Sequence, residues 1–542
     1  MKISDRMLLS GNEAIALAAY KSKVALGAGY PGTPSTEILE NFSAFGGQAQ
    51  WSPNEKVALE VAIGAAFGKT RAMATMKHVG LNVAADPLFT AAYTGVQGAL
   101  VIVCADDPGM ASSQNEQDNR NYAAAAGLPM LEPSDSQEAY DFTVAAFELS
   151  EKWNIPVILR VTTRICHSKT VVNVKDIEAP SYKADFVRDI KGRVMIPAYA
   201  RIAHKKLRQK LDEIAAWNED SDLNQVFEGD KSLGVITSGI SFPHSREAAP
   251  GASLFKLSVS YPLPIEKIRK FAASVDRCVV IEEGDPYLEK ALLAEGIKVE
   301  GKVQMYRFGE FNVDRVRRII AGDESPEAVP APGKPPQLCQ GCPHRIVFQI
   351  LSDLDCIVSG DIGCYTLGVL PPFQAMDSCV CMGASVSIGL GLRHVLPDEQ
   401  ANRVVSVIGD STFMHSGITG LVDMVYNKPK TGHVVIILDN GTTAMTGLQE
   451  HPGTGRLLDH TASARIDYEA LGKSIGIQNV HTIDHVKFKD EFKKLLMDAL
   501  EKNEPTLLIA RKECVLAVRK IRQYEKEAAE QLKCQCQCEG QE

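Results

Sequence analysis

The feature that most constrains the fold of this chain is a pair of apolar, β-branched runs separated by a helical segment. Residues 404–408 and 434–438 are continuous apolar runs, the pattern of parallel strands that are buried on both faces. Residues 417–426, between them, have the apolar spacing of a helix. Because neighbouring parallel strands need a crossover connection, the stretch predicts a βαβ unit within a doubly wound α/β fold.

Polar residues follow both of these strands, as GDS at 409–411 and DNG at 439–441. Ligands of parallel α/β sheets bind outside the carboxyl ends of the strands, so these residues are expected at one edge of the sheet. The carboxylate of Asp410, the amide oxygen of Asn440 and the backbone carbonyl of Thr442 would form an oxygen-only site that suits Mg²⁺ bound to a diphosphate. Either polar residue alone is explained as an ordinary turn residue, but the pair in one βαβ unit favours a diphosphate site.

The stretch resembles the diphosphate-binding motif of thiamine diphosphate enzymes, in which GDG is followed by a spacer and NN. Ser411 stands in place of the third motif residue and Asp439 in place of the first Asn, and neither position is a metal ligand. The resemblance implies that the cofactor is thiamine diphosphate with Mg²⁺. It implies cofactor contacts from Gly409, Asp410, Ser411, Asn440, Thr442, Gly363, Cys364 and Gly383, with Asp410, Asn440 and Thr442 as the Mg²⁺ ligands.

Length and composition limit the class of protein. A chain of 542 residues exceeds one hydrophobic core and predicts about three domains. A net charge of −9 argues against nucleic-acid binding. The N-terminus lacks the pattern of a signal peptide and no apolar run reaches about 18 residues, so we expect a cytoplasmic protein without a membrane segment. In that compartment the thirteen cysteines are expected to be thiols.

The N-terminal part alternates helical stretches with short apolar strands, which predicts a doubly wound α/β layer. Expected helices are 12–21, 55–69 and 86–94, and expected strands are 24–26, 71–76, 99–104 and 156–160. Polar loops are expected at 77–88 and 105–120, where an α/β domain keeps ligand contacts.

The glycine- and proline-rich turn GAGYPGTPSTE, residues 27–37, leads into a helix whose free N–H groups can meet an anion. A plain loop is the alternative explanation. The turn resembles the YPITPSS motif of pyruvate ferredoxin oxidoreductases, in which the Thr faces the substrate carboxylate. This resemblance assigns that role to Thr33, with Gly32 in place of the motif Ile enlarging the pocket.

Glu55 has two interpretations. With Ser52 as N-cap and Pro53 as the first helical residue, Glu55 would complete a capping box and need no chemical role. The run 52–68 also resembles the helix of thiamine enzymes whose Glu hydrogen-bonds N1′ of the aminopyrimidine. The diphosphate motif elsewhere in the chain favours this catalytic role.

Composition divides the rest of the chain. The predicted regions are a pyrimidine-binding domain (1–195), a charged connecting arm (196–230), a small α/β domain resembling the transketolase C-terminal domain (231–324), a Pro-rich linker (325–336), the diphosphate and Mg²⁺ domain (337–517), and a helix with a Cys-containing tail (518–542). Within the small domain, the acidic segment 282–289 is expected to be a solvated turn and the start of a helix rather than a site.

Four cysteines of the predicted diphosphate and Mg²⁺ domain resemble, in their order, the [4Fe–4S] ligands in the small thiamine-binding subunits of 2-oxoacid ferredoxin oxidoreductases. They are Cys339, Cys342, Cys364 and Cys514. Four thiolates are what such a cluster needs. The spacers differ from that family's, however, and unligated cysteines are common in cores. A zinc site lacks a second C-x-x-C or a paired His, although His344 is close. Cys379 and Cys381 are expected to be core residues.

The order of motifs over residues 5–517 resembles the large subunit of indolepyruvate ferredoxin oxidoreductases. That family normally continues into a ferredoxin-like domain, whereas this sequence has only Cys534, Cys536 and Cys538. The resemblance therefore implies electron exit through another subunit. It also implies a homodimeric core in a hetero-oligomer with a smaller oxidoreductase subunit.

The activity that the resemblance implies is oxidative decarboxylation of an aryl 2-oxo acid, with electrons passing to ferredoxin or another iron–sulfur carrier and the acyl group to coenzyme A. Two alternatives stay open. One is a non-oxidative arylpyruvate decarboxylase that uses the same Glu55 and Mg²⁺ site. The other is a non-catalytic subunit that retains the fold.

Overall fold

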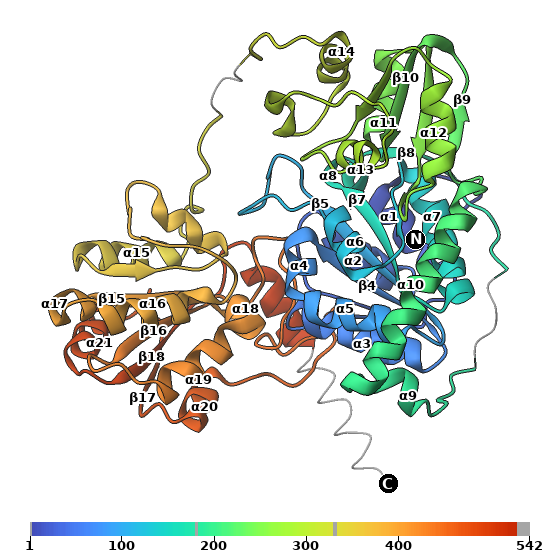
Figure 1. Ribbon diagram of the computed structural model, residues 1–542. Helices are drawn as coiled ribbons and strands as arrows, with labels where there is room; N and C mark the ends of the chain where they lie inside the picture. Colours follow the sequence, from blue (N-terminus) through green and yellow to red (C-terminus); the bar gives the residue numbers. More distant parts are fainter. Residues whose placement is uncertain (1–2, 179–182, 329–332, 528–542) are drawn as a thin grey trace. The chain divides into compact units, whose positions relative to one another are not determined.

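The computed structural model describes residues 3–178, 183–328 and 333–527, and the chain divides into two compact units, 1–329 and 330–542. Each unit is built from parallel sheets with helices on both faces, so the predicted α/β class is confirmed (Figure 1). No helix in the described ranges is long and apolar enough to span a membrane.

The largest sheet of the first unit has seven strands. Across the sheet they are β12 (Val259–Tyr261), β6 (Met130–Leu131), β7 (Val157–Thr162), β5 (Ala99–Asp106), β4 (Arg71–Lys77), β2 (Leu26–Gly29) and β3 (Ala49–Trp51). Every neighbouring pair is parallel except β12 with β6. All residues of β4, β5 and β7 are buried, as expected for central strands with covered faces.

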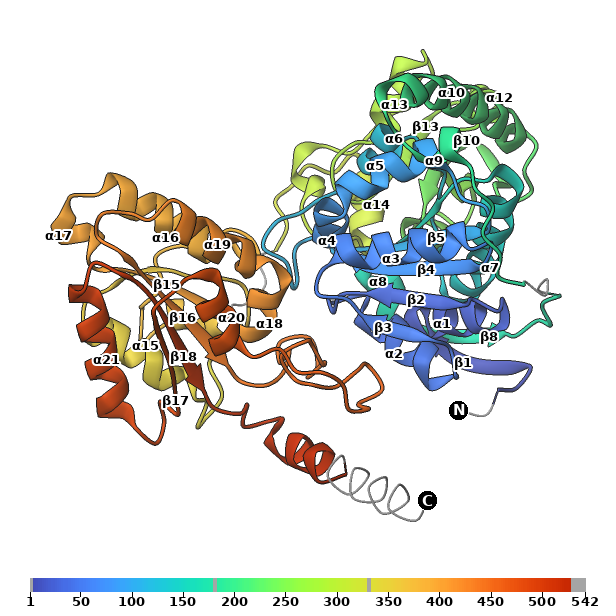
Figure 2. The same cartoon turned by 90° about the horizontal axis from the view of Figure 1, so that it is seen from below.

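Helices cover both faces of this sheet (Figure 2). One face packs against α3 (Glu55–Phe67), α5 (Ala85–Thr94), α6 (Arg120–Ala126) and α10 (Pro197–Glu219). The other carries α1 (Gly11–Lys21), α2 (Thr36–Ala44) and α7 (Ser136–Trp153). Leu207, Leu211 and Ile214 of α10 belong to the core of the sheet, so most of the segment expected as a connecting arm is a packed helix.

Short elements complete this part of the unit. Strands β1 (Arg6–Ser10) and β8 (Lys169–Asn173) form an antiparallel pair. The short helices are α4 (His78–Val83), α8 (Thr163–His167) and α9 (Ile190–Arg193). Residues 77–88 were expected to be a loop, and this expectation is wrong, because they contain the end of β4, all of α4 and the start of α5.

A smaller sheet follows in the first unit. Its order is β13 (Cys278–Ile281), β10 (Asp230–Ser238), β11 (Ala252–Leu257) and β9 (Gln225–Phe227), with only β9 antiparallel. Helices α12 (Ile265–Ala273) and α13 (Leu288–Ala294) pack in one of its cores, and α11 (Ser241–Ala248), α14 (Val313–Ala321) and the turn η1 (Gln304–Arg307) pack in the other. Directly after β11, the chain enters the seven-stranded sheet as β12.

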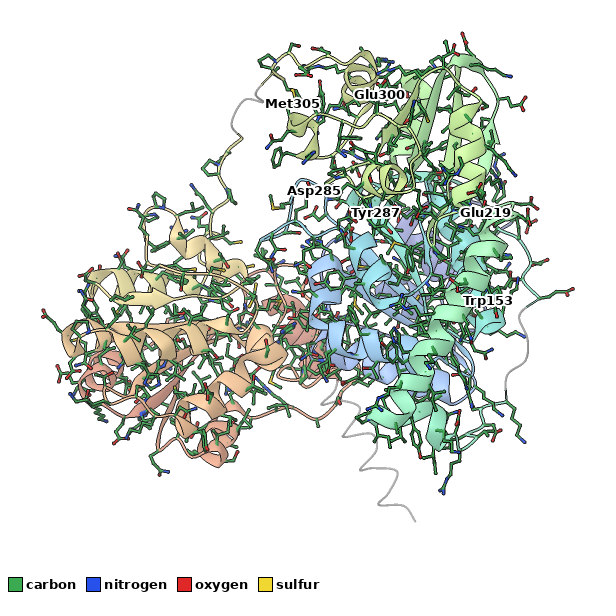
Figure 3. All side chains as sticks on the ribbon, in the orientation of Figure 1. Trp153, Glu219, Asp285, Tyr287, Glu300 and Met305 are labelled. Atoms are coloured by element: carbon green, nitrogen blue, oxygen red, sulfur yellow. The ribbon has the colours of Figure 1, made fainter. Side chains whose placement is uncertain are left out.

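Buried ion pairs connect the small sheet with the large one. Arg120, at the start of α6, donates to Glu282 Oε2 at 2.6 Å and to the backbone oxygen of Glu283 at 3.2 Å. The Arg120 guanidinium also lies 5.0 Å from the ring centre of Tyr287, which is labelled in Figure 3. Glu282 is 2% exposed and accepts the first N–H groups of α13. The expected solvated turn at 282–289 is therefore wrong at Glu282, a buried charge partner.

The second unit contains one parallel sheet with the order β14 (Ile357–Ser359), β15 (Val404–Gly409), β16 (His433–Asp439), β18 (Pro505–Arg511) and β17 (Asn479–Ile483). One face packs against α15 (His344–Asp353) and α21 (Lys489–Glu501), and the other against α16 (Ala384–Val395), α19 (Ile418–Tyr426) and α20 (Tyr468–Ile475). The predicted βαβ unit is confirmed as β15, α19 and β16.

The remaining short segments of this unit are η2 (Cys364–Val369), α17 (Asp398–Ala401), α18 (Asp410–Thr412) and the π-helical turn η3 (Phe413–Gly417). Residues 518–527 are helical, as predicted for the start of the C-terminal helix. Cys534, Cys536 and Cys538 lie outside the described residues.

We predict that Arg120→Ala strongly destabilises the first unit. The change leaves the Glu282 carboxylate buried without its cation, and breaking a buried pair in this way costs about 3–5 kcal/mol. Arg269→Ala is the matched control, because Arg269 is an exposed arginine that pairs with Glu266, and an exposed pair contributes less than about 1 kcal/mol. Urea unfolding of both variants measures the difference, and equal losses would contradict the role given to Arg120.

Candidate functional site

In the first unit, the carboxyl ends of three adjacent strands bring the predicted residues of the N-terminal domain together. Strand β2 leads into the turn that contains Thr33, β4 ends at Lys77, and β5 ends at Asp106. Thr33 is half-buried, and its carbonyl accepts the hydroxyl of Ser112, from the segment after β5, at 3.5 Å. This is the edge at which parallel sheets bind ligands.

Glu55 is the first residue of α3, and its side chain is 4% exposed. The N-cap is Asn54, whose side-chain oxygen accepts the N–H of Val57 at 2.9 Å. The capping box expected from Ser52 and Glu55 is therefore wrong: Ser52 lies before the cap and donates its N–H to the carbonyl of Gly29 at 2.8 Å.

The Glu55 side chain packs against the backbone of α4. A Cβ added at Gly80 would lie 2.6 Å from both Cγ and Oε1 of Glu55, so the close approach requires glycine there. The capping-box explanation of Glu55 is therefore removed, and its carboxyl group is buried at the carboxyl edge of the sheet.

Lys77 is a residue of this edge to which the sequence assigned no role of its own. Its side chain is 8% exposed, and its Nζ donates to the carbonyl of Ser112 at 2.7 Å. Burial lowers the pKa of Lys77 to about 8, although the carboxylates of Asp107 and Glu55 act in the opposite direction. The sequence signal was its position directly after the expected strand 71–76, and in the structure it is the last residue of β4.

In the second unit, Asp410 connects the two strand ends of the βαβ unit. The residue is 2% exposed, and its Oδ1 accepts the N–H of Ser411 at 2.9 Å. Its Oδ2 accepts the N–H of Gly441, beyond the end of β16, at 2.8 Å. Burial raises the pKa of Asp410, but His451 and the N–H groups of Gly441 and Ser411 outweigh burial and hold the pKa below its ordinary value.

His451 was not found by sequence reasoning. Its Nδ1 accepts the N–H of Gly453 at 3.2 Å, which leaves the ring proton on Nε2, and Nε2 lies 3.3 Å from Oδ2 of Asp410. The imidazole therefore faces the carboxylate that the sequence predicted as a metal ligand.

Asn440 and Thr442 lie in the turn after β16. The Oδ1 of Asn440 accepts the N–H of Thr442 at 3.0 Å, and its amide nitrogen lies 3.3 Å from Nε2 of His344. Burial lowers the pKa of His344 to about 4, so the imidazole is neutral and accepts the amide hydrogen. Thr443 donates its hydroxyl to the Ser411 hydroxyl at 2.8 Å, which joins this turn to the one after β15.

The predicted glycines are joined to this site through Asp361, a residue that the sequence did not single out. The buried Asp361 carboxylate accepts the N–H groups of Ile362, Gly383 and Ser385. It thereby connects the turn that contains Gly363 and Cys364 with the start of α16. The Ile362 carbonyl accepts the hydroxyl of Thr412, beside Asp410, at 2.9 Å.

Two glycines keep the backbone of this site free of side chains. A Cβ at Gly409 would lie 2.7 Å from the ring of Tyr365, and a Cβ at Gly383, where φ is +83°, would lie 2.2 Å from the Ser416 hydroxyl. Side chains are therefore excluded at both places, which leaves backbone groups at the strand ends.

These residues fit Mg²⁺ held together with a diphosphate. A buried carboxylate, an amide oxygen and a peptide carbonyl are hard oxygen donors, and a metal bound mainly by a substrate's phosphates needs few protein ligands. No group of three or more His, Cys, Asp or Glu side chains in the described part of the chain is arranged to hold a metal ion. The fit therefore rests on a mixed set of oxygen donors from Asp410, Asn440 and Thr442.

The four predicted cluster cysteines, Cys339, Cys342, Cys364 and Cys514, are all among the described residues, and no three of them are arranged to hold a metal ion. Burial, followed by the neighbouring thiols of Cys514, Cys342 and Cys339, raises the pKa of Cys364 to about 11. Burial and the thiols of Cys339 and Cys514 likewise raise the pKa of Cys342 to about 11.

Backbone contacts place these segments beside the Asn440 turn. The N–H of Cys514 donates to the carbonyl of Asn440 at 3.0 Å, and a Cβ at Gly341 would lie 3.9 Å from a methyl group of Val515. Cys379 is half-buried against the core, whereas Cys381 is exposed, so the expectation of a core position is wrong for Cys381.

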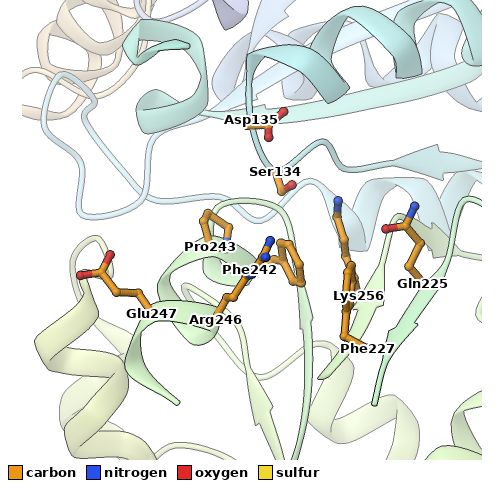
Figure 4. Close-up of a pocket in the computed structure, with 9 residues that line it drawn as sticks. All are labelled: Ser134, Asp135, Gln225, Phe227, Phe242, Pro243, Arg246, Glu247 and Lys256. Atoms are coloured by element: carbon orange, nitrogen blue, oxygen red, sulfur yellow. The ribbon is translucent and has the colours of Figure 1, made fainter. Parts of the chain in front are cut away.

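A separate cavity of about 480 Å³ lies in the first unit between the two sheets (Figure 4). Its lining includes Lys256, Arg246 and Phe242. None of the predicted site residues lines it, and Lys256 is already paired with Glu138. This cavity is distinct from the edge that carries Glu55 and Thr33.

Two family models match this chain. Residues 17–206 match the thiamine-diphosphate-binding domain of pyruvate flavodoxin/ferredoxin oxidoreductases. Residues 361–510 match the C-terminal thiamine-pyrophosphate-binding domain of thiamine pyrophosphate enzymes. The first match contains Glu55 and Lys77, and the second contains Asp410 and Asn440.

Curated relatives match over nearly the whole chain. Indolepyruvate oxidoreductase subunit IorA of Archaeoglobus fulgidus is 40% identical over 96% of this chain and 88% of its own length. The subunit of the same name from Pyrococcus abyssi is 37% identical over 95% of this chain and 86% of its own.

A solved structure shares part of the fold. The 2-oxoglutarate:ferredoxin oxidoreductase of Magnetococcus marinus, with 2-oxoglutarate, coenzyme A and succinyl-CoA bound, matches 59% of this chain and 65% of its own with a TM-score of 0.51 and 18% identity. At that identity the likeness concerns the fold alone. The identity and coverage of the curated relatives, together with the two domain matches, show that the chain belongs to the IorA family of thiamine-diphosphate-dependent indolepyruvate oxidoreductase subunits.

Proposed function

We propose that this chain binds thiamine diphosphate and Mg²⁺ and oxidatively decarboxylates an aryl 2-oxo acid of the indolepyruvate or phenylpyruvate type. The electrons pass to ferredoxin or another iron–sulfur carrier, and the acyl group passes to coenzyme A. The observation that carries the proposal is the bond from Gly441 N–H to Asp410, which brings the two polar strand ends of the diphosphate motif into one site. The names of the curated relatives support the aryl substrate.

Mg²⁺ would be held by the Asp410 carboxylate, the Asn440 amide oxygen and the Thr442 carbonyl. Gly409, Ser411, Gly363, Cys364 and Gly383 would contact the cofactor. Thiamine diphosphate, when bound, supplies a nucleophilic carbon and an acceptor for the electrons left by CO₂. The protein would orient both reactants and exclude water from the reacting groups.

Glu55 would share a proton with N1′ of the aminopyrimidine. Its burial, and its position against Gly80, support this role because a dehydrated carboxylate is a stronger hydrogen-bond partner than one in water. Thr33 would donate its hydroxyl to the substrate carboxylate from the turn after β2.

Cys339, Cys342, Cys364 and Cys514 would hold one [4Fe–4S] cluster that receives the electrons. The assignment rests on the resemblance of the four positions to the family's ligands, since in this structure no three of the thiols are arranged to hold a metal ion. The chain would act as a homodimeric core in a hetero-oligomer with a smaller subunit.

A non-oxidative decarboxylase would use the same thiamine site without these thiols, and the names of the curated relatives, which are oxidoreductase subunits, favour the oxidative reaction. The two reactions differ in product. Anaerobic assays with phenylpyruvate, coenzyme A and ferredoxin should yield acyl-CoA and reduced ferredoxin, whereas release of aldehyde without either acceptor would contradict the proposal.

Asp410→Asn should weaken the Mg²⁺-dependent binding of thiamine diphosphate by at least about 10–100-fold, the range found even for outer partners of a metal. The change keeps the size of the side chain but removes its charge. Calorimetric titration with the cofactor, with and without Mg²⁺, measures the effect. Asp423→Asn, an exposed change on α19 of the same unit, should bind like the parent, and unchanged affinity in Asp410→Asn would refute the metal site.

Glu55→Gln should lower kcat/KM by about 10²–10⁴-fold, because an amide cannot share the N1′ proton. The variant should keep its melting temperature, since Asn54 rather than Glu55 caps α3. Glu60→Gln, an exposed change in the same helix, is the control. A Glu55→Gln enzyme that turns over like the parent would rule out the proton role.

Cys364→Ser should lose most of the iron and the visible absorbance of anaerobically purified protein, because three thiolates hold a [4Fe–4S] cluster poorly. Cys356→Ser is the matched control, since Cys356 is a half-buried thiol of the same unit outside the predicted set. If the iron content of the two variants is the same, the cluster assignment is wrong.

A further inference from the structure

The proposed function requires a cation for the substrate carboxylate in addition to the Thr33 hydroxyl. A carboxylate that leaves water for a buried site is unfavourable unless it is paired and hydrogen-bonded. Any group that meets it must lie beside Thr33. This inference rests on the proposed function and concerns the same edge of the seven-stranded sheet.

The side chain of Lys77 contacts the turn that contains Thr33. A Cβ added at Gly32 would lie 3.3 Å from Cβ and 3.7 Å from Cδ of Lys77, so the turn rests on the aliphatic part of this side chain. The amine continues to Ser112, which also contacts the Thr33 carbonyl. Thr33 and the Lys77 amine therefore share Ser112 as a neighbour.

The Lys77 amine has no carboxylate partner among the residues that the structure describes. Its hydrogen bonds go to the carbonyl and, at 3.5 Å, the hydroxyl of Ser112. A carboxylate that influences it, Asp107, is engaged by other donors: the N–H of Ser112 at 2.9 Å and the hydroxyls of Ser113 and Thr163 at 2.5 Å and 2.9 Å. A nearly buried ammonium group bonded only to neutral oxygens is poorly compensated.

We propose that the ammonium group of Lys77 binds the carboxylate of the 2-oxo acid, together with the hydroxyl of Thr33. The bond to the Ser112 carbonyl holds the amine in place before substrate arrives. An incoming carboxylate supplies the charge that the protein lacks at this point, and a charge-assisted hydrogen bond is stronger than one to a neutral carbonyl.

The alternative role for Lys77 is structural: its hydrogen bond to Ser112 would hold β4 and the segment after β5 together. A structural role needs only a hydrogen-bond donor, whereas binding of a carboxylate needs the positive charge. Lys77→Gln separates the two, since its amide is a donor without charge. Lys77→Met removes both properties.

The charge of Lys77 also predicts a pH dependence. The titratable groups that interact with the Lys77 amine are Asp107 after β5, Glu55 at the start of α3 and His78 at the start of α4. The two carboxylates raise the pKa of Lys77, but burial is the larger effect and lowers this pKa to about 8. The ammonium form is complete well below pH 8 and is lost as the pH rises through that value. Carboxylate affinity should therefore decline above pH 8 in the parent and be independent of pH over this range in Lys77→Gln.

The test compares two inhibitors that differ only at the carboxyl group, 3-phenylpropanoate and 3-phenylpropanamide, against the purified enzyme with thiamine diphosphate and Mg²⁺. In Lys77→Gln and Lys77→Met, the inhibition constant of the acid should rise by about tenfold or more, as expected for loss of a charged hydrogen bond. The inhibition constant of the amide should stay within about twofold of its value for the parent enzyme. Lys210→Met is the control, because Lys210 also donates to a backbone carbonyl and has a pKa lowered by burial, but lies on α10.

The proposal would be overturned if the ratio of the two inhibition constants in Lys77→Gln were the same as in the parent enzyme. This includes the case in which both inhibitors bind more weakly by the same factor. Lys77→Gln decides the matter if Lys77→Met does not fold. Failure of the proposed function gives a different result, since the parent enzyme would then not oxidise phenylpyruvate at all.

Discussion

The hydrogen bond from the Gly441 N–H to Oδ2 of Asp410 is the interaction on which the candidate cofactor site depends. It joins the turns that follow β15 and β16, and it requires the parallel register in which Gly409 pairs with Leu438. In the joined turns, the amide nitrogen of Asn440 lies 3.3 Å from Nε2 of His344. A shift of register by one residue would move this whole set of polar groups away from the edge of the sheet.

The arrangement is costly for the folded state. Lys77 and His344 are nearly or fully buried, and burial lowers the pKa of each, so the folded state disfavours their charged forms. The buried Asp410 carboxylate stays charged only because its partners outweigh burial. Buried polar and charged groups stabilise a protein only when they are fully paired, so these residues are not placed where stability alone would put them. Their placement is understandable if a charged ligand completes the pairing, which is the common feature of the two proposals.

The elements and site residues that the sequence predicted are those that local pattern determines. The strands of the βαβ unit follow from continuous apolar runs, and Asp410 and Asn440 follow from their position after those strands. The errors concern environment set by distant residues. Glu282 belongs to an acidic run that indicates a solvated turn, and its burial depends on Arg120, 162 residues away.

The same reasoning explains two further outcomes at the first sheet. Lys77 could not be distinguished from other polar residues, because its neighbours Gly32 and Ser112 come from separate loops. The start of α3 was misplaced for a different reason, since Ser52 and Asn54 are both good N-cap residues, and Pro53 favoured the earlier one. The structure places the cap at Asn54, after the chain has bonded to Gly29 through Ser52.

Strand β12 has a consequence for the order in which the chain can assemble. The seven-stranded sheet is completed at one edge by residues 259–261, which pair with Met130 and Leu131 of β6. During synthesis, β6 therefore remains an open edge until the ribosome has released the small sheet as far as β11 and the residues after it. Contacts between such distant segments form slowly, and an unpaired strand edge can associate with other chains. A fragment that ends before residue 259 would therefore expose the edge of β6 that the complete chain covers.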